Sequence, residues 1–327
     1  MKNRVLVTGG AGFVGHHFVE AFLKNTDWDI VVLDKLSYAS NGFDRLRDIN
    51  AYDDKRVTLL SADLSLPIQD GIAREIGNVQ YIFHLAAESH VDNSIKDPEP
   101  FVRSNVLGTM HLLNFARTLT GLKTFFYFST DEVFGPAPEN YSFKEHDEHN
   151  PSNPYAAAKS GGEMICKAYR NTYKLPIVIT RSMNIIGERQ HPEKFIPMCV
   201  NKILKGEVIP IHANKDKTKA GTRFYIHARN VADGYLFLVN KGISDGEYHI
   251  TGEKEVSNLD LALLIGQILG KEVKYEMTDF HSSRPGHDLR YALDGHKMAE
   301  LGWKPPKTFE QSLRKTIEWT MANPKWL

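Results

Sequence analysis

The chain has 327 residues, of which 42% are hydrophobic, so it can bury a large core and is long enough for about two domains. Its 40 basic residues balance its 40 acidic ones, which excludes a global electrostatic field that would recruit nucleic acid or an anionic membrane. Two cysteines, Cys166 and Cys199, are too few for a disulfide framework, and no apolar run approaches the ~18 residues of a membrane span. We therefore expect a cytoplasmic protein with no metal site and no nucleic-acid or membrane partner.

Short apolar runs alternate with segments of helical periodicity in the first half of the chain. The runs are rich in β-branched and aromatic residues, which favours strands, and they cover residues 5–8, 30–33, 57–60, 81–85, 125–129 and 177–180. Their near-continuous hydrophobicity is typical of parallel strands that are buried on both faces. Segments 15–24 and 106–119, with apolar residues at helical spacing, lie between the strands. This alternation predicts an α/β fold built on a doubly wound parallel sheet of the Rossmann type.

A glycine-rich turn, with the sequence TGGAGFVG at residues 8–15, follows the first predicted strand. Glycines at this place let the backbone approach a pyrophosphate closely, and the helix that follows offers unpaired N–H groups and a favourable dipole. Asp34 closes the second predicted strand at the separation, roughly 20 residues, at which a carboxylate binds an adenosine ribose and repels a 2′-phosphate. NAD is therefore favoured over NADP, although the adjacent Lys35 works against this preference and a helix-capping role for Asp34 is the alternative.

Four ionisable side chains lie in the motifs STDEVFG and YAAAK, which follow the fifth predicted strand. Tyr155 and Lys159 stand at i and i+4, hence on one face of a helix, and we expect the ammonium to lower the pKa of the Tyr155 phenol until it acts as a general base. Asp131 and Glu132 add an acid and a base that a simple redox enzyme does not need. Removal of water next to a transient ketone uses both, so the sequence predicts a dehydratase that uses a redox cofactor without consuming it. The alternatives are a surface lysine beside a packed aromatic ring and an acidic pair that caps a turn.

The regular pattern decays after residue 181. Several prolines, the polar stretch 214–219 and the loop 282–286 indicate a smaller, loop-rich region that binds the substrate. The predicted domains are, for the NAD-binding Rossmann part, residues 1–181 and about 224–250, and, for the smaller and mostly C-terminal substrate-binding part, about 182–223 and 251–327.

The chain resembles the extended short-chain dehydrogenase/reductase superfamily and, within it, the dTDP-glucose 4,6-dehydratase family. The matching segments run along nearly the whole chain and comprise residues 8–13, 34–39, 84–92, 129–133, 155–159, 191–194 and 284–288. The glycine-rich turn and the YxxxK motif are typical of the whole superfamily. Adjacent Asp131 and Glu132 are more specific, because sugar-nucleotide epimerases and decarboxylases of similar fold generally lack them.

The resemblance implies a lyase of deoxysugar metabolism that converts a nucleotide-diphosphate glucose, dTDP-glucose first and UDP-glucose next, to the 4-keto-6-deoxy sugar. Tyr155, helped by Lys159 and Thr130, takes the proton of the 4-hydroxyl while hydride leaves C4 for the nicotinamide. Glu132 then removes the C5 proton as Asp131 protonates the departing 6-hydroxyl, and hydride returns to C6. Carboxyls this close tend to split their pKa values, so that one starts protonated and the other ionised.

The resemblance also implies contacts to the cofactor and to a sugar-nucleotide substrate. The implied NAD contacts are Gly9, Gly12, Phe13, Val14, Asp34, Lys35, Ser37, Asp63, Leu64, Leu85, Ala86, Ala87, Ser104, Tyr155 and Lys159. The implied substrate contacts are Ser89, Thr130, Asn184, Lys194, Phe195, Pro210, His212, Arg223, Asn258, Arg284 and His287. The chain departs from the family at His212, where tyrosine is usual, and at Ser283, where aspartate is usual. Phe224 and Ile226 also change the pattern around Arg223, so the sequence leaves open which nucleobase is bound and whether the sugar is N-acetylated.

Two other functions fit part of this sequence. An NAD-dependent sugar-nucleotide epimerase or decarboxylase shares the cofactor site and the Tyr155/Lys159 pair, but it leaves Asp131 and Glu132 without a role. A catalytically silent, NAD-binding regulatory protein would leave Asp131, Glu132, Tyr155 and Lys159 without a catalytic role. The resemblance further implies a homodimer that pairs through helices in segments 106–119 and 155–173.

Overall fold

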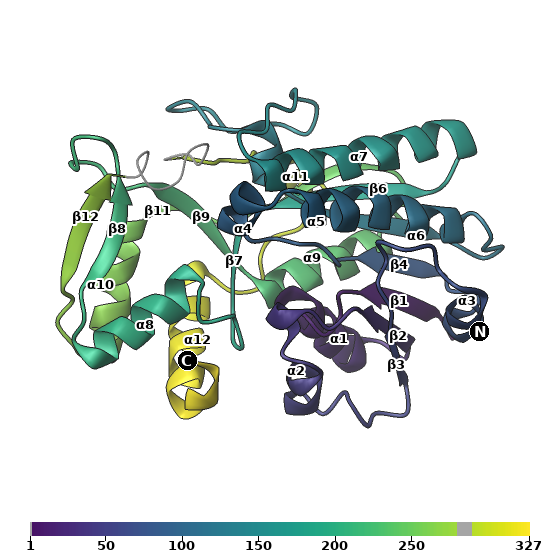
Figure 1. The fold of residues 1–327 in the computed structure, drawn as a ribbon, viewed down its shortest axis with the longest axis horizontal. Helices are drawn as coiled ribbons and strands as arrows, with labels where there is room; N and C mark the ends of the chain where they lie inside the picture. The colour runs from purple at the N-terminus through teal and green to yellow at the C-terminus, as the bar shows by residue number, and fades with distance from the viewer. Residues whose placement is uncertain (1, 280–289) are drawn as a thin grey trace.

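The computed structural model describes residues 2–279 and 290–327, and its centre is a seven-stranded parallel sheet (Figure 1). The strands lie in the order β10-β6-β5-β4-β1-β2-β3. They are β1 (Arg4–Thr8), β2 (Asp29–Asp34), β3 (Val57–Ser61), β4 (Tyr81–His84), β5 (Thr124–Thr130), β6 (Ile177–Ser182) and β10 (Gly246–Ile250). The order reverses at β1, which makes the sheet doubly wound and confirms the predicted fold class. Each predicted strand is present, whereas β10, a short strand far along the chain, was not predicted.

Helices surround this sheet and a second, smaller region. They are α1 (Phe13–Asn25), α2 (Asp44–Asp48), α3 (Asp70–Ile76), α4 (Val91–Lys96), α5 (Glu99–Val102), α6 (Gly108–Ala116), α7 (Pro154–Tyr173), α8 (Phe195–Lys205), α9 (Ala228–Asn240), α10 (Asn258–Leu269), α11 (His296–Glu300) and α12 (Phe309–Ala322). Within residues 2–279 and 290–327, no helix combines the length and the apolar character needed to cross a bilayer.

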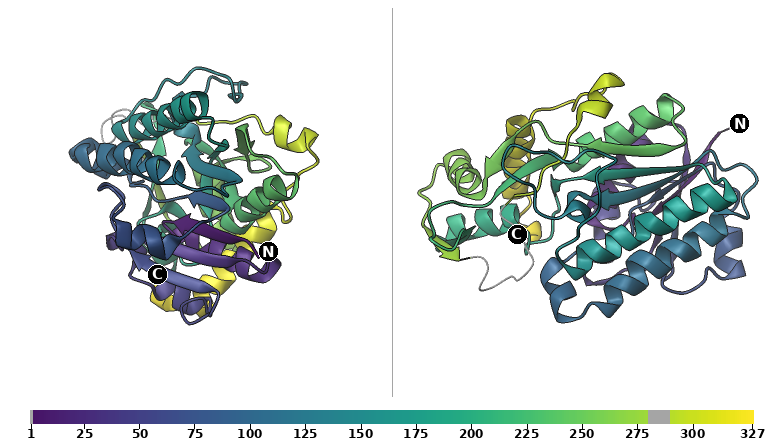
Figure 2. Two further views of the ribbon diagram at one scale, coloured as in Figure 1. Left: turned by 90° about the vertical axis from the view of Figure 1, so that its right-hand side faces the viewer. Right: turned by 90° about the horizontal axis from the view of Figure 1, so that it is seen from above.

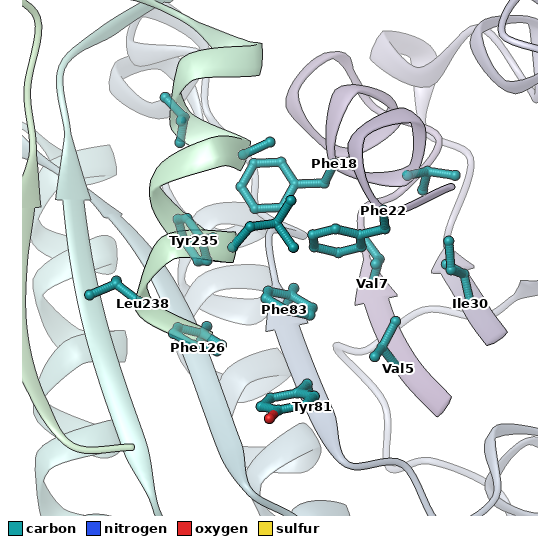
Figure 3. Packing of buried hydrophobic residues seen from close by; sticks show 14 of the residues in the cluster. Val5, Val7, Phe18, Phe22, Ile30, Tyr81, Phe83, Phe126, Tyr235 and Leu238 are labelled. Carbon is teal, nitrogen blue, oxygen red and sulfur yellow. The ribbon is translucent and has the colours of Figure 1, made fainter. Parts of the chain in front are cut away.

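Apolar residues on the two faces of the sheet pack under different helices. On β1, Val5 and Val7 belong to the cluster beneath α1 and α9, whereas Leu6 belongs to the cluster on the other face, beneath α6 and α7. Figure 3 shows the first cluster, in which the rings of Phe18 from α1 and Tyr235 from α9 meet with centroids 4.8 Å apart. The central strand β1 is therefore buried on both faces, which explains its continuous apolar run, whereas the edge strand β3 is only partly buried.

A second region lies to the left of the central sheet in Figure 1. Its two small sheets have the orders β11-β9-β7 and β12-β8. They are formed by β7 (Asn184–Ile186), β8 (Ile209–Ala213), β9 (Thr222–His227), β11 (Glu255–Ser257) and β12 (Tyr275–Asp279). α8, α10 and α12 share a separate apolar cluster there that includes Ile203, Leu261 and Leu313. The return of the chain to the central sheet through α9 and β10 supports the predicted domain division, which stays a prediction.

Helix α7 carries the YxxxK motif and is fixed to the sheet by buried charges. Glu163, in the middle of the helix, forms an ion pair with Arg181 of β6, with 2.6 Å between Oε2 and Nη2, and neither side chain is exposed. Arg181 also binds Glu247 of β10, at 2.7 Å. Hydrogen-bonded charges, in addition to apolar contacts, therefore set the position of α7 over β6.

Candidate active site

The glycine-rich turn between β1 and α1 permits close approach to its backbone. Gly9 has a φ of +70°, and a Cβ there would lie 2.7 Å from the amide nitrogen of Ala86, which follows β4. A Cβ on Gly15 would collide with the carbonyl oxygen of Gly9. The N-cap of α1, Gly12, provides no side-chain cap, and the first turn of the helix holds no acidic residue. The N–H groups that begin α1 therefore suit an anionic group such as a pyrophosphate.

Asp34 ends β2 beside this turn. Its Oδ2 accepts the N–H of Ala11 at 3.1 Å, its Oδ1 accepts the N–H of Leu36 at 2.8 Å, and burial raises its pKa. Lys35, the residue that weakens the sequence argument for NAD, forms an ion pair with Glu88, with 2.6 Å between Nζ and Oε1. Because that ammonium already has a carboxylate partner, the site keeps the acidic character that disfavours a 2′-phosphate.

One pocket brings together all the residues that the sequence predicts to contact NAD. Its lining runs from the glycine-rich turn past Asp34 to Tyr155 and Lys159. Oγ of Ser129 also belongs to this lining, is buried, and has no hydrogen-bond partner among the described residues. Such an orphaned hydroxyl fits a site that binds a polar ligand. Further lining residues that were not predicted include Tyr38, Gln190, His191 and Glu193.

A short π-helix, Arg103–Leu107, supports one wall of this pocket. Its buried Asn105 donates its side-chain amide to the carbonyl oxygen of Glu88 at 3.0 Å and accepts the N–H of Glu88 at 2.9 Å. These two bonds fix the loop after β4, which supplies several of the predicted NAD contacts. Asn105 was not predicted, because an asparagine inside a helical pattern gives no sign of a π-turn, although π-turns are frequent at functional sites.

The carboxyl end of β5 carries the predicted acids. Thr130 ends the strand and donates its hydroxyl to Oδ1 of Asp131 at 3.0 Å, while the backbone N–H of Glu132 donates to Oγ1 of Thr130 at 3.4 Å. Asp131 is 4% exposed, and burial, followed by the negative charge of Glu132, raises its pKa to about 7. A carboxyl with this pKa is protonated in about half of the molecules at neutral pH and in most of them below it, so it can act as a general acid.

Glu132 has a different environment from its neighbour. Its side chain is only partly buried, and its Oε2 accepts an N–H from the side-chain amide of Asn153 at 2.9 Å. Asn153 is buried and is also the N-cap of α7, where its Oδ1 accepts the N–H of Ala156 at 2.9 Å. Two adjacent acids are thus held in unlike surroundings, the condition under which one carboxyl works as an acid and the other as a base.

Tyr155 and Lys159 both line the pocket from α7, as their spacing predicts, but the predicted effect of Lys159 on Tyr155 is wrong. Burial, followed by the charge of Glu132, raises the pKa of the Tyr155 phenol, and a hydrogen bond with Thr130 offsets only part of this. Nζ of Lys159 donates to the carbonyl oxygen of Phe128 at 2.5 Å, and burial lowers the pKa of Lys159 to about 8. The spacing places both side chains on one face of the helix, but burial and the neighbouring carboxylates, and not the ammonium, determine the pKa of Tyr155.

A second pocket adjoins the first, and Phe13, Ser129 and Tyr155 line both. The predicted catalytic residues Thr130, Asp131 and Glu132 belong to the lining of this second pocket. The predicted substrate contacts in its lining are Ser89, Thr130, Asn184, Lys194, Phe195 and Arg223. The structure therefore places the two acids, Tyr155 and most of the described substrate contacts around one space.

Three predicted substrate contacts lie elsewhere. Pro210 and His212 are on β8 in the two-stranded sheet, and they are not in the lining that the described residues form. Asn258, at the start of α10, accepts the hydroxyl hydrogen of Tyr225 at 2.8 Å, and Tyr225 lines the pocket. The roles of these residues stay predictions. The positions outside the described residues are Arg284, His287 and Ser283.

Comparisons with known proteins agree with this geometry. The model of the family described as GDP-mannose 4,6 dehydratase matches residues 6–316. The dTDP-glucose 4,6-dehydratase of Escherichia coli is 36% identical, over 99% of this chain and 94% of the relative. A trifunctional Arabidopsis thaliana protein, named UDP-glucose 4,6-dehydratase for its first activity, is 34% identical over 98% of this chain and 47% of its own length. The crystal structure of DesIV, the dTDP-glucose 4,6-dehydratase of Streptomyces venezuelae with NAD and TYD bound, superimposes with a TM-score of 0.88 and 37% identity, covering 99% of this chain and 98% of that one.

The Rossmann sheet, the glycine-rich turn and the YxxxK helix together define an extended short-chain dehydrogenase/reductase. Within that superfamily, the chain belongs to the dTDP-glucose 4,6-dehydratase family, as the resemblance of its sequence predicts.

We expect Asp131→Asn to change how stability depends on pH. Asp131 has a pKa of about 7 in the folded chain, whereas an aspartate in an unfolded chain has a pKa of about 3.9. As pH rises through this interval, the unfolded wild type releases the proton first, so its free energy of unfolding falls, by at most roughly 4 kcal/mol. The variant lacks this titration. Urea unfolding at about pH 5 and about pH 8 should therefore show the variant gaining stability relative to the wild type. An equal difference at both pH values would contradict the raised pKa.

Proposed function

We propose that this chain is an NAD-dependent 4,6-dehydratase that acts on a nucleotide-diphosphate glucose. The observation that carries the proposal is the adjacent pair Asp131 and Glu132, which line the same pocket as Tyr155. Asp131 is buried with a raised pKa, whereas Glu132 receives a hydrogen bond from Asn153. An acid that starts protonated and a neighbouring base are what elimination of water requires, and neither is needed to oxidise an alcohol.

The residues present fit NAD. The uncapped start of α1 suits a pyrophosphate, and Asp34 lies where a carboxylate binds an adenosine ribose. Tyr155 and Lys159 belong to the lining of the same pocket. When bound, NAD would supply the hydride acceptor for oxidation at C4, the hydride donor for reduction at C6 and a positive charge in the site.

Tyr155 is assigned the first proton transfer, removal of the proton from the 4-hydroxyl. Its side chain lines both pockets, so it can reach a group held between them. The raised pKa of Tyr155 in the free protein opposes this role, while the hydrogen bond with Thr130 favours the phenolate. Lys159 adds a cation on the same face of α7. Further stabilisation of the phenolate has to come from bound ligands, such as the positively charged cofactor.

Asp131 and Glu132 divide the elimination. A ketone at C4 acidifies the hydrogen on C5, and Glu132 takes that proton as a base. Asp131 donates its proton to the departing 6-hydroxyl, so that water leaves and a C5–C6 double bond forms. Glu132 then returns a proton to C5 as C6 is reduced, and water is the only net loss from the sugar.

Among nucleotide sugars, dTDP-glucose is the first candidate and UDP-glucose the second. The Escherichia coli relative and the Streptomyces venezuelae structure carry the name dTDP-glucose 4,6-dehydratase, and the plant relative is named for UDP-glucose. In this chain Arg223 is 5% exposed and lines the second pocket. A guanidinium suits a diphosphate because its donors form a fixed fork.

The homodimer and the cytoplasmic location are further parts of this proposal. Helices α6 and α7 lie side by side along one flank of the sheet (Figure 2). Met164 and Tyr173 on α7 are 43% and 44% exposed, and Val102 of α5 is 48% exposed. Large apolar side chains exposed along such helices support pairing with a second copy of the chain.

The test of the function is incubation of the purified protein with dTDP-glucose and, separately, with UDP-glucose at catalytic amounts of NAD. We expect complete conversion of one of them to a 4-keto-6-deoxy product, with no rise in reduced cofactor, because hydride is borrowed and returned. Product mass and near-ultraviolet absorbance report the two quantities. Reduced cofactor that accumulates in proportion to product would show a net dehydrogenase, and inversion at C4 without loss of water would show an epimerase.

Two variants separate the two bases. Glu132→Gln should still oxidise the sugar and stall before elimination, so that reduced cofactor builds up on the enzyme in a single turnover. Tyr155→Phe should fail before that stage. Loss of one proton-transfer group typically costs roughly 10²- to 10⁴-fold in rate, so both variants should be slow. The assignment of roles is wrong if Glu132→Gln eliminates water at the wild-type rate, or if both variants accumulate reduced cofactor equally.

Light scattering at micromolar concentration should give the mass of a dimer. Met164→Glu places a charge on α7 and should shift the protein towards monomer, because burying an unpaired charge in an interface is costly. Met321→Glu, at a methionine of 44% exposure on α12, is the matched control and should leave the dimer intact. A monomeric wild type, or equal dissociation in both variants, would contradict pairing through this face.

A further inference from the structure

We infer that Asn153 is a positioning residue that orients Glu132 for removal of the C5 proton while it begins helix α7. For its meaning in catalysis, this inference rests on the proposed function. Nδ2 of Asn153 donates to Oε2 of Glu132 at 2.9 Å, and Oδ1 accepts the N–H of Ala156 at 2.9 Å. The two partners fix which end of the amide points where, because only the N–H end can donate to a carboxylate and only the oxygen can accept a backbone N–H.

The location of Asn153 links the base to the tyrosine. Asn153 is 5% exposed and immediately precedes the first turn of α7, which contains Tyr155. The N–H of Tyr155 is held by Oγ of Ser94 at 3.1 Å, and Ser94 is fully buried. The first turn of α7 is therefore fixed on one side by Ser94 and on the other by Asn153.

The chemistry explains why such a link is useful. The 4-hydroxyl and the C5 hydrogen are on adjacent carbons, so the groups that accept their protons have to keep a fixed separation. Tyr155 is carried by α7 and Glu132 by the turn after β5, and the long connecting segment 135–153 separates these two elements. Asn153 connects the Glu132 carboxylate directly to the start of the helix that carries Tyr155. Misplacement by about 1 Å can cost roughly 10²-fold in rate.

The type of hydrogen bond also distinguishes the two acids. The amide N–H of Asn153 can only donate, and donation to a carboxylate favours its ionised form. The hydroxyl of Thr130, which contacts Asp131, can donate or accept and so is compatible with either protonation state. The pairing of Asn153 with Glu132 and of Thr130 with Asp131 therefore fits the division into base and acid.

Other charged and titratable groups lie in this pocket, so the effect of Asn153 has to be measured as a difference between two proteins. Besides Glu132, the charged and titratable groups that line the pocket are Asp131, Tyr155, Tyr225, Arg223, Lys194, Glu193, Asp92 and His90. A substitution that leaves all of them in place makes their contributions common to both proteins.

Asn153→Asp is the informative change. Aspartate is as good an N-cap as asparagine, so the bond to the Ala156 N–H and the start of α7 should be kept. The new carboxylate cannot donate to Glu132 and repels it. We expect a melting temperature that falls as pH rises, because the two carboxylates repel each other once both are ionised. We also expect a rate of C5 proton transfer lower by roughly 10- to 100-fold, the range for loss of a hydrogen bond to a charged group, and an acidic limb of the kcat profile moved to higher pH. Oxidation at C4 in a single turnover should change much less.

Two comparisons make the test specific. Thr308→Asp changes the N-cap of α12, away from the site, and should leave the rate and the pH profile unchanged, which controls for an acid at a helix N-terminus. Infrared titration of protein labelled with ¹³C-glutamate needs no substrate, and the band that disappears in a Glu132→Gln background reports Glu132. In the Asn153→Asp protein this band should titrate at higher pH than in the wild type.

Each outcome decides the inference. Elimination, pH profile and infrared titration all like the wild type would overturn it. A lower melting temperature with an unshifted titration of Glu132 would also overturn it, by showing that Asn153 acts only as a cap. If the wild type converts no nucleotide sugar, the proposed function fails, while a shifted infrared titration still establishes that Asn153 controls the ionisation of Glu132.

Discussion

A buried ion pair between Arg181 and Glu163 holds the active-site helix against the sheet, and the geometry of the site depends on it. Both side chains are fully buried, so their charges depend on buried partners: Glu163 on Arg181, and Arg181 on Glu163 and Glu247. Removal of one partner of such a pair typically costs about 3–5 kcal/mol. The same helix carries Tyr155 and Lys159 and, through its N-cap Asn153, contacts Glu132. A shift of α7 would therefore move one base relative to the other.

The site around this helix contains buried polar groups that reduce the stability of the fold. The pKa values of Asp131 and Tyr155 are raised chiefly by burial, and the buried hydroxyl of Ser129 has no hydrogen-bond partner among the described residues. Such groups cluster at functional sites because the chemistry needs them and the surrounding fold supplies the stability. Here the surrounding fold includes two apolar clusters, one on each face of the central sheet.

Much of this arrangement could be predicted from local sequence. Buried parallel strands produce apolar runs, so the sheet could be predicted from the sequence. A tight turn before a helix requires glycine, so the nucleotide-binding turn and the position of Asp34 beside it could be predicted too. The features that could not be predicted depend on how separate segments pack together. β10 has the sequence GEYHI, in which polar residues interrupt the apolar pattern, so it gives no strand signal. The pair Asn153–Pro154 marks a helix start without showing that the amide of Asn153 reaches Glu132. The predicted pKa shift of Tyr155 was wrong for the same reason, because the spacing of residues in a sequence indicates which side chains are neighbours but not how deeply they are buried.

The proposed reaction requires one site to remove hydride from C4 and to return it to C6 of the same sugar. The most direct measurement uses dTDP-glucose deuterated at C4, with NAD present in catalytic amount, and locates the deuterium in the product by NMR and mass spectrometry. Recovery of the deuterium at C6 of a 4-keto-6-deoxy sugar is the predicted result. Deuterium that is lost to solvent or retained in the cofactor, with an unlabelled C6, would contradict it.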